Sequence, residues 1–193
     1  MNNKVIMIEG SRGVGKTFLV KSLNMDANIH KIPFAGYFNE CFVNDFPDLT
    51  KEEANKKTDI HYYSLAYDII VLDLVKTNKI NYDLIVDRSL LSSFVFGILA
   101  NRVTFDQIKN EYDWIKKTYG QHIEIIYVNG NTGDDTRNKD MWNIYNNKET
   151  HDMYKKIIKE LEIPVTYFNN NYDEKSVDGF NVLIRSKMND LPR

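Results

Sequence analysis

Val5-Ile-Met-Ile-Glu-Gly-Ser-Arg-Gly-Val-Gly-Lys-Thr17 is the stretch of the chain that decides its fold. It contains the pattern G-x-x-x-x-G-K-[ST], which begins at Gly10 and ends at Thr17. Glycine adopts backbone conformations with positive φ that other residues avoid, and it has no Cβ to obstruct a bound group. The freed N–H groups of such a turn point into one concavity that binds anionic oxygens. Because an apolar strand at residues 4–9 precedes the turn and a helix is expected from Lys16, the context is that of a phosphate-binding loop.

The side chains of this loop predict a site for ATP and Mg²⁺. Lys16 would reach the β- and γ-phosphates, and the Thr17 hydroxyl would be a ligand of the metal ion. A helix that starts at Lys16 adds the positive end of its dipole. The loop residues expected to bind the nucleotide are Gly10, Arg12, Gly13, Val14, Gly15, Lys16 and Thr17.

Composition places few demands on the rest of the chain. It has 193 residues, of which 42% are hydrophobic and 27% charged, and a net charge of −2. These values predict one globular domain over residues 1–193 and no charge-driven clamping of duplex DNA. Cys41 is the only cysteine, which suits a reducing, cytoplasmic location. No apolar run approaches the length of a membrane span, so no membrane contact is expected.

Apolar runs and helical periodicity alternate along the chain, which predicts a parallel sheet with helices on both faces. The expected fold is therefore a three-layer α/β P-loop NTPase fold with a five-stranded sheet. The predicted strands are 4–9, 29–34, 83–89, 123–128 and 164–168. The predicted helices begin at Lys16 and then cover 61–76, 90–100, 104–119, 148–161 and 177–188, with Thr104 as an N-cap and Gly120 as a C′ residue.

A second motif, Asp87-Arg88-Ser89, follows the third predicted strand. Ligands of such sheets sit beyond the carboxyl ends of the strands, so this motif should face the phosphate-binding loop. Asp87 would hold Mg²⁺ directly or through water. The planar guanidinium of Arg88 would grip a phosphoryl group.

The two motifs together resemble those of the thymidylate kinase and deoxynucleoside kinase group of P-loop kinases. Thymidylate kinases carry I-E-G-x-x-G-x-G-K-[ST] and D-R-Y-x-x-S-x-x-A-Y, and this chain matches the second pattern at Asp87, Arg88 and Ser92, with Phe96 at an aromatic position. Deoxynucleoside kinases have E-R-S, to which Arg88-Ser89 is similar. The resemblance implies transfer of the ATP γ-phosphoryl group to a nucleoside or nucleotide. It also implies a LID at about 129–148, in which Arg137, Lys139 and Lys148 are candidates for neutralising charge on the nucleotide. Asn169–Tyr172 would border the adenine.

The acceptor side departs from the family pattern. Arg12 stands where thymidylate kinases usually have an acidic residue, and a guanidinium cannot accept a hydrogen bond from a sugar hydroxyl. The acceptor region is expected at about 35–76, where no arginine or lysine lies between Lys57 and Lys76. Candidate acceptor contacts are Arg12, Glu40, Tyr63, Tyr67, Arg88, Ser92 and Phe96. Glu40 or Asp87 would receive the proton if the acceptor is a hydroxyl.

Two other functions stay open on the sequence alone. A kinase acting on a hydroxyl within DNA or RNA, at a 5′ end or on a modified base, would use the same ATP site with a more open acceptor side. A regulatory NTPase switch is the other, although no guanine-specifying N-K-x-D is present. The expected partners are thus a nucleoside or nucleotide, a nucleic-acid strand under the first alternative, and a second copy of the chain in a homodimer.

Overall fold

The structure is a computed structural model that describes residues 3–23, 31–32, 58–130 and 147–188. Its elements, in chain order, are β1 (Val5–Glu9), α1 (Lys16–Lys21), β2 (Lys31–Ile32), α4 (Thr58–Lys76), β3 (Leu84–Asp87), α5 (Leu90–Leu99), α6 (Phe105–Tyr119), the short 3₁₀ helix η1 (Gly120–His122), β4 (Ile123–Gly130), α7 (Asn147–Glu160), β5 (Thr166–Asn170) and α8 (Glu174–Lys187). Strands and helices alternate as the sequence predicts.

The strands form one parallel sheet in the order β2-β3-β1-β4-β5. The strand that carries the phosphate-binding loop therefore lies in the middle, between β3 and β4. Its register pairs Ile8 with Asp87 and Glu9 with Tyr127, so the loop after β1 and the charged motif after β3 leave the sheet side by side. This order explains how two motifs about 75 residues apart in the sequence come to share one edge.

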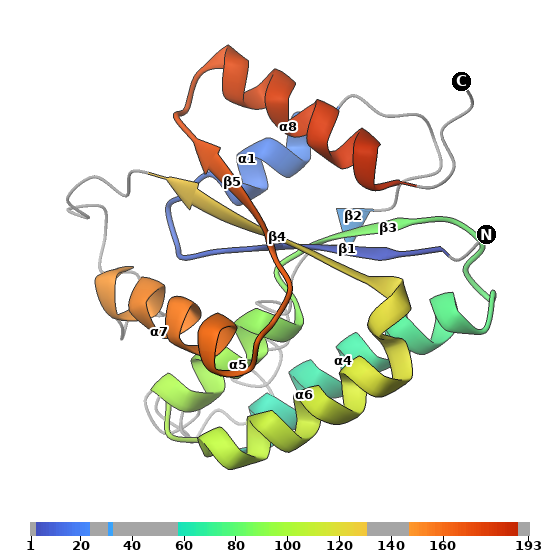
Figure 1. Cartoon of the computed structure of the whole chain (residues 1–193), viewed down its shortest axis with the longest axis vertical. Coiled ribbons are helices and arrows are strands. Elements are labelled where there is room, and N and C mark those ends of the chain that lie inside the picture. The colour runs from blue at the N-terminus through green and yellow to red at the C-terminus, as the bar shows by residue number, and fades with distance from the viewer. Residues whose placement is uncertain (1–2, 24–30, 33–57, 131–146, 189–193) are drawn as a thin grey trace, which may run out of the picture.

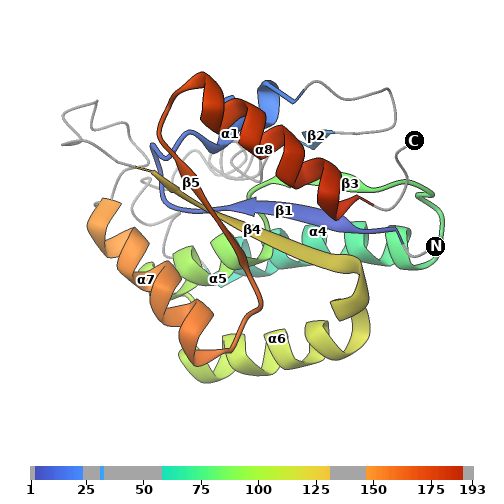
Figure 2. The same ribbon diagram turned by 45° about the horizontal axis from the view of Figure 1, so that its top comes forward.

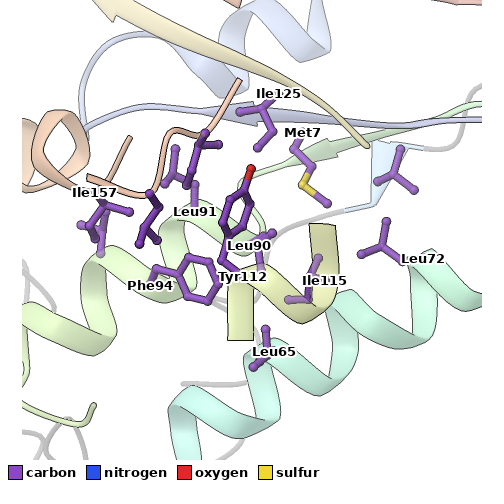
Figure 3. Close-up of a cluster of buried hydrophobic side chains, with 14 of the residues drawn as sticks. Met7, Leu65, Leu72, Leu90, Leu91, Phe94, Tyr112, Ile115, Ile125 and Ile157 are labelled. Atoms are coloured by element: carbon purple, nitrogen blue, oxygen red, sulfur yellow. The ribbon is translucent and has the colours of Figure 1, made fainter. Parts of the chain in front are cut away.

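Helices cover both faces of the sheet, as Figures 1 and 2 show. On one face α1 and α8 enclose a buried cluster in which Leu19, Phe180 and Ile184 meet Ile6 and Ile126 of the strands. On the other face α4, α5, α6 and α7 enclose a larger cluster. Figure 3 shows part of it, with Met7 and Ile125 of the sheet above side chains of α4, α5 and α6. The alternating strand side chains thus divide between two cores, which confirms the predicted α/β parallel-sheet architecture.

Most helix ends follow from local sequence. Thr104 caps α6 in a reciprocal capping box with Gln107, as predicted. The prediction for Gly120 was wrong: it has φ −54° and ψ −32°, and it continues into η1 instead of turning left-handed. The last helix also begins earlier than predicted, because the side chain of Asp173 accepts a hydrogen bond from the Ser176 amide. β5 starts two residues later than predicted and extends to Asn170.

Candidate active site

The loop after β1 has the backbone that its glycines predict. Gly10 has φ 138° and Gly15 has φ 81°, both in the region that favours glycine. A Cβ at Gly10 would collide with the carbonyl of Val128 on the neighbouring strand, and one at Gly15 would collide with the side-chain amide of Asn170. The loop is therefore packed against β4 and the end of β5, and glycine is required by space as well as by φ.

Lys16 is buried within the loop, with 4% of its surface exposed. Its ammonium group donates a hydrogen bond of 2.5 Å to the carbonyl oxygen of Ser11. Burial, with a further contribution from the nearby charge of Arg88, holds the pKa of Lys16 well below its ordinary value. A phosphate bound in the loop would give this ammonium group a negatively charged partner.

The Thr17 hydroxyl and the Asp87 carboxylate lie together at the start of α1 and the end of β3. Thr17 Oγ1 donates a 2.5 Å hydrogen bond to Asp87 Oδ2. The other carboxylate oxygen, Asp87 Oδ1, is the one buried side-chain polar atom of the described residues that has no hydrogen-bond partner. A buried carboxylate oxygen without a partner is unusual in a folded protein and calls for a donor or an ion.

These two residues fit Mg²⁺, which prefers oxygen ligands and usually takes only one or two carboxylates along with water and phosphate oxygens. Within the described residues no group of three His, Cys, Asp or Glu side chains gathers into a metal site. Magnesium held by Thr17, Asp87 and the phosphates of a nucleotide needs no such cluster.

Arg88 follows Asp87 in a left-handed conformation, with φ 69°. Its amide donates to the carbonyl of Ile8 at 2.9 Å, which continues the ladder between β1 and β3 past the last strand residue. Its guanidinium lies 5.8 Å from the centre of the Phe96 ring and 3.5 Å from the hydroxyl of Tyr154. A bulky residue with positive φ is a strained feature that often marks a functional position.

Glu9, the last residue of β1, is fully buried and caps the N-terminus of α5. Its Oε1 accepts hydrogen bonds from the amides of Ser89, Leu91 and Ser92 at 2.9, 3.1 and 3.2 Å, and its Oε2 accepts one from the Ser92 hydroxyl at 2.5 Å. Burial raises the pKa of Glu9, and the hydrogen bonds from Ser92 oppose that rise. A carboxylate from a neighbouring strand thus replaces the side-chain cap that Ser89 does not provide.

A second buried carboxylate, Asp68 of α4, meets the same turn from the other side. Its Oδ1 accepts a 2.7 Å hydrogen bond from the Ser89 hydroxyl, and its Oδ2 accepts a weaker one from Ser93 at 3.4 Å. Burial raises the pKa of Asp68 to about 8. Further along the same α4–α5 contact, His61 bridges the Ser93 carbonyl and the Glu111 carboxylate at 3.2 and 2.9 Å. α4 is therefore bound to the Arg88 turn by polar contacts.

The last residue of β5 and the turn that follows it are hydrogen-bonded to the phosphate-binding loop. Asn170 Nδ2 donates to the Val14 carbonyl at 2.9 Å, and the Tyr172 hydroxyl donates to the Gly13 carbonyl at 2.6 Å. The segment expected to border adenine thus does lie against the loop. Tyr172 itself has φ 62°.

The candidate acceptor residues that the structure describes fall into different environments. Tyr63 is exposed, whereas Tyr67 packs against the larger core, and burial raises its pKa. Ser92 is fully buried and hydrogen-bonded to Glu9 and to the Tyr154 hydroxyl, which fits support of the α5 turn better than contact with a substrate. Arg12 is half-buried in the loop and Phe96 is half-buried beside Arg88. Glu40, Arg137 and Lys139 lie outside the described residues, as do positions 131–146 of the predicted LID. Lys148, the remaining LID candidate, lies in the first turn of α7, where its ammonium group pairs with the Asp152 carboxylate at 2.9 Å.

The sequence alone assigned no role to Glu9, Asp68 or Tyr154. The available signals were a charged residue at the end of an apolar strand, and an aspartate beside the apolar Leu65, Ile69 and Leu72 of α4. A buried charge requires a partner, but the partners of Glu9 lie at least 80 positions away in the sequence.

No family model matches the chain, and no curated protein is similar to it in sequence. Solved structures are similar in fold. Thymidylate kinase from Ehrlichia chaffeensis superimposes with a TM-score of 0.61 at 13% identity over 97% of this chain and 99% of that one. The fold is that of the P-loop kinases.

Two further structures agree. Deoxyadenosine kinase from M. mycoides, in a structure with the products dCMP and dCDP, has a TM-score of 0.57 at 17% identity over 95% of this chain and 97% of that one. NadR protein in complex with NR has a TM-score of 0.60 at 15% identity over 100% of this chain. The present chain spans about half of the NadR chain, 53% of its length. Within the described residues no helix is long and apolar enough to cross a membrane.

Proposed function

We propose that this protein is an ATP-dependent kinase that transfers the γ-phosphoryl group to a nucleoside or nucleotide. One observation carries the proposal: the unpartnered Asp87 oxygen and the Thr17 hydroxyl lie together beside a phosphate-binding loop, with Arg88 next in the chain. The similarity in fold to thymidylate kinase and deoxyadenosine kinase supports the same reaction class.

Different residues of the chain would bind the phosphates, the metal ion and the transferred group. Lys16 exchanges the Ser11 carbonyl for phosphate oxygens, which costs little because the buried ammonium gains a counter-charge. Thr17 and Asp87 would hold Mg²⁺. Mg-ATP supplies the phosphoryl group to be transferred and neutralises part of its charge. Arg88 offers two parallel N–H groups to the oxygens of the transferring or accepting group.

The acceptor would bind between this turn and α4. Phe96 and Tyr63 offer ring faces for a base, and Arg12 offers a cation for an acceptor phosphate. Glu40 is the proposed proton acceptor if the acceptor is a hydroxyl, and Arg137 with Lys139 in the LID is proposed to stabilise charge during transfer. We expect Arg12→Asp to raise the KM for a phosphorylated acceptor and to leave ATP binding nearly unchanged.

A transfer screen tests the proposal. Wild-type protein is incubated with Mg²⁺ and γ-labelled ATP against separate panels of nucleosides, nucleoside monophosphates and oligonucleotides with 5′-hydroxyl ends. We expect labelled product from one of the first two panels and none from Lys16→Ala, while the exposed α8 variant Lys175→Ala matches the wild type. Label only in the oligonucleotide panel would move the function to a nucleic-acid kinase. Release of labelled phosphate with no labelled acceptor would favour an NTPase switch and contradict the proposal.

A further inference from the structure

Three hydrogen bonds hold the two residues of the turn at Arg88 and Ser89. Arg88 is a long side chain in the left-handed region, and such a conformation persists only where the surroundings impose it. Its own amide is bonded to the Ile8 carbonyl at 2.9 Å. The next residue, Ser89, is held twice: its amide donates to Glu9 at 2.9 Å and its hydroxyl donates to Asp68 at 2.7 Å.

The two carboxylates reach Ser89 from different elements. Glu9 belongs to β1, next to the phosphate-binding loop, and fixes the backbone of the turn to the sheet. Asp68 belongs to α4, which is packed against α5 and forms part of the proposed acceptor side. The Ser89 hydroxyl is thus a tie between the proposed acceptor side and the residue next to Arg88.

Burying the carboxyl group of Asp68 costs free energy that an apolar side chain at this position would not. Its exposed fraction is 5%, and burial raises its pKa to about 8, so near pH 7 a carboxylic acid with two oxygen atoms sits among hydroxyl groups. Ser89, Ser93 and, through Ser93, Ser64 at 2.7 Å form a chain of hydroxyls around it. An apolar residue would pack α4 on α5 without this network, which suggests that a directed contact is needed here.

We propose that Asp68 is a positioning residue for phosphoryl transfer: through the Ser89 hydroxyl it holds the turn that aims the Arg88 guanidinium. The inference rests on the proposed kinase function. Because Asp68 acts through Arg88, its loss should slow the transfer step in which Arg88 takes part and should not change the affinity of the loop for ATP.

A double-mutant cycle tests this relation, with kcat, the KM for ATP and the KM for the acceptor measured for each protein. Asp68→Ala is expected to lower kcat on the order of 10-fold, and at most about 100-fold, as for a small misplacement of a reacting group. The KM for ATP should stay within about twofold. In an Arg88→Ala background the Asp68→Ala change should have no further effect on kcat, because its route of action has been removed.

Two more variants separate positioning from folding. Asp68→Asn keeps an oxygen that can accept from the Ser89 hydroxyl and resembles the protonated acid, so it should recover most of kcat. Ser89→Ala removes the same contact from the other side and should match Asp68→Ala, which keeps the test decisive if Asp68→Ala folds poorly. Asp73→Ala, exposed on the same helix, should match the wild type.

The outcomes are distinct. If the Asp68→Ala and Arg88→Ala losses multiply, or if Asp68→Ala raises only the KM for ATP, the positioning role is wrong while the kinase function stands. If the wild type transfers phosphate to no acceptor, the kinase function fails and this inference falls with it.

Discussion

Removing the Glu9 carboxylate is the change whose effect on stability the structure defines best. Glu9→Ala deletes an acceptor from the end of the central strand and leaves the amides of Ser89, Leu91 and Ser92 without their partner. These amides form the first turn of α5, and water does not easily replace the carboxylate because Glu9 is fully buried.

The size of the effect follows from these contacts. A buried donor that loses its acceptor costs about 1–3 kcal/mol, so three amides cost roughly 3–9 kcal/mol. Removing a carboxylate whose burial raises its pKa returns part of that cost. We expect a net loss of about 3–5 kcal/mol in the free energy of unfolding, a large share of the roughly 5–15 kcal/mol of an ordinary domain.

Urea denaturation followed by far-UV circular dichroism measures this loss as a fall in midpoint at an unchanged slope. Glu9→Gln is the matched variant, since its carbonyl oxygen still accepts from the amides; we expect a loss of about 1–2 kcal/mol. Asp173→Ala is the control, because Asp173 caps α8 through the amide and hydroxyl of a single residue, Ser176, and the loss of such a cap costs about 1 kcal/mol. A Glu9→Ala protein no less stable than Asp173→Ala would refute the role of Glu9 as the cap of α5.

Three further predictions concern the loop, the buried acid and the metal pair. Gly15→Ala should destabilise the fold and abolish nucleotide binding, because residue 15 has φ 81° and a Cβ there would collide with its neighbours. Gly120→Ala should instead stabilise the fold by about 0.4–1 kcal/mol, because φ −54° is open to any residue. Thermal melting of both variants measures the difference. The pKa of Asp68 is about 8 in the folded protein, against an ordinary value of 3.8, so between these values the folded state keeps a proton that the unfolded chain loses. The free energy of unfolding should therefore fall as the pH rises from about 4 to 8, by at most about 1.4 kcal/mol per pH unit. Urea midpoints at several pH values should show a flatter profile for Asp68→Asn, and parallel profiles would count against the assignment. Thr17→Ala should weaken nucleotide binding in Mg²⁺ by about tenfold or more and have little effect in EDTA, because only the metal-bound form uses the Thr17–Asp87 pair; calorimetry with and without the metal decides.

Local sequence was sufficient for the parts of the site that lie within one motif. The glycines, Lys16 and Thr17 occupy one strand-turn-helix unit, and the conformations that the pattern requires at Gly10 and Gly15 are those found. Asp87 was predicted to face the loop because parallel strands present their carboxyl ends at one edge, and its pairing with Thr17 agrees.

The supporting contacts could not be predicted because they depend on register between distant segments. Glu9 finds its amides on α5 only because Ile8 lies beside Asp87 in the sheet, and the Asp68–Ser89 contact depends on how α4 crosses α5. Ser92 illustrates the limit: its place in the motif suggested a contact with substrate, but helix periodicity turns it toward Glu9.

Calorimetric titration with a non-hydrolysable ATP analogue in Mg²⁺ measures whether the Gly10–Thr17 loop holds a nucleoside triphosphate, on which the proposed reaction depends. We expect one site per chain and binding at least about tenfold weaker in Lys16→Ala, because a charge-assisted contact with phosphate contributes about 1.5–3 kcal/mol. Lys175→Ala should bind like the wild type. Wild-type protein that binds no triphosphate, or Lys16→Ala protein that binds as tightly as the wild type, would contradict this role of the loop.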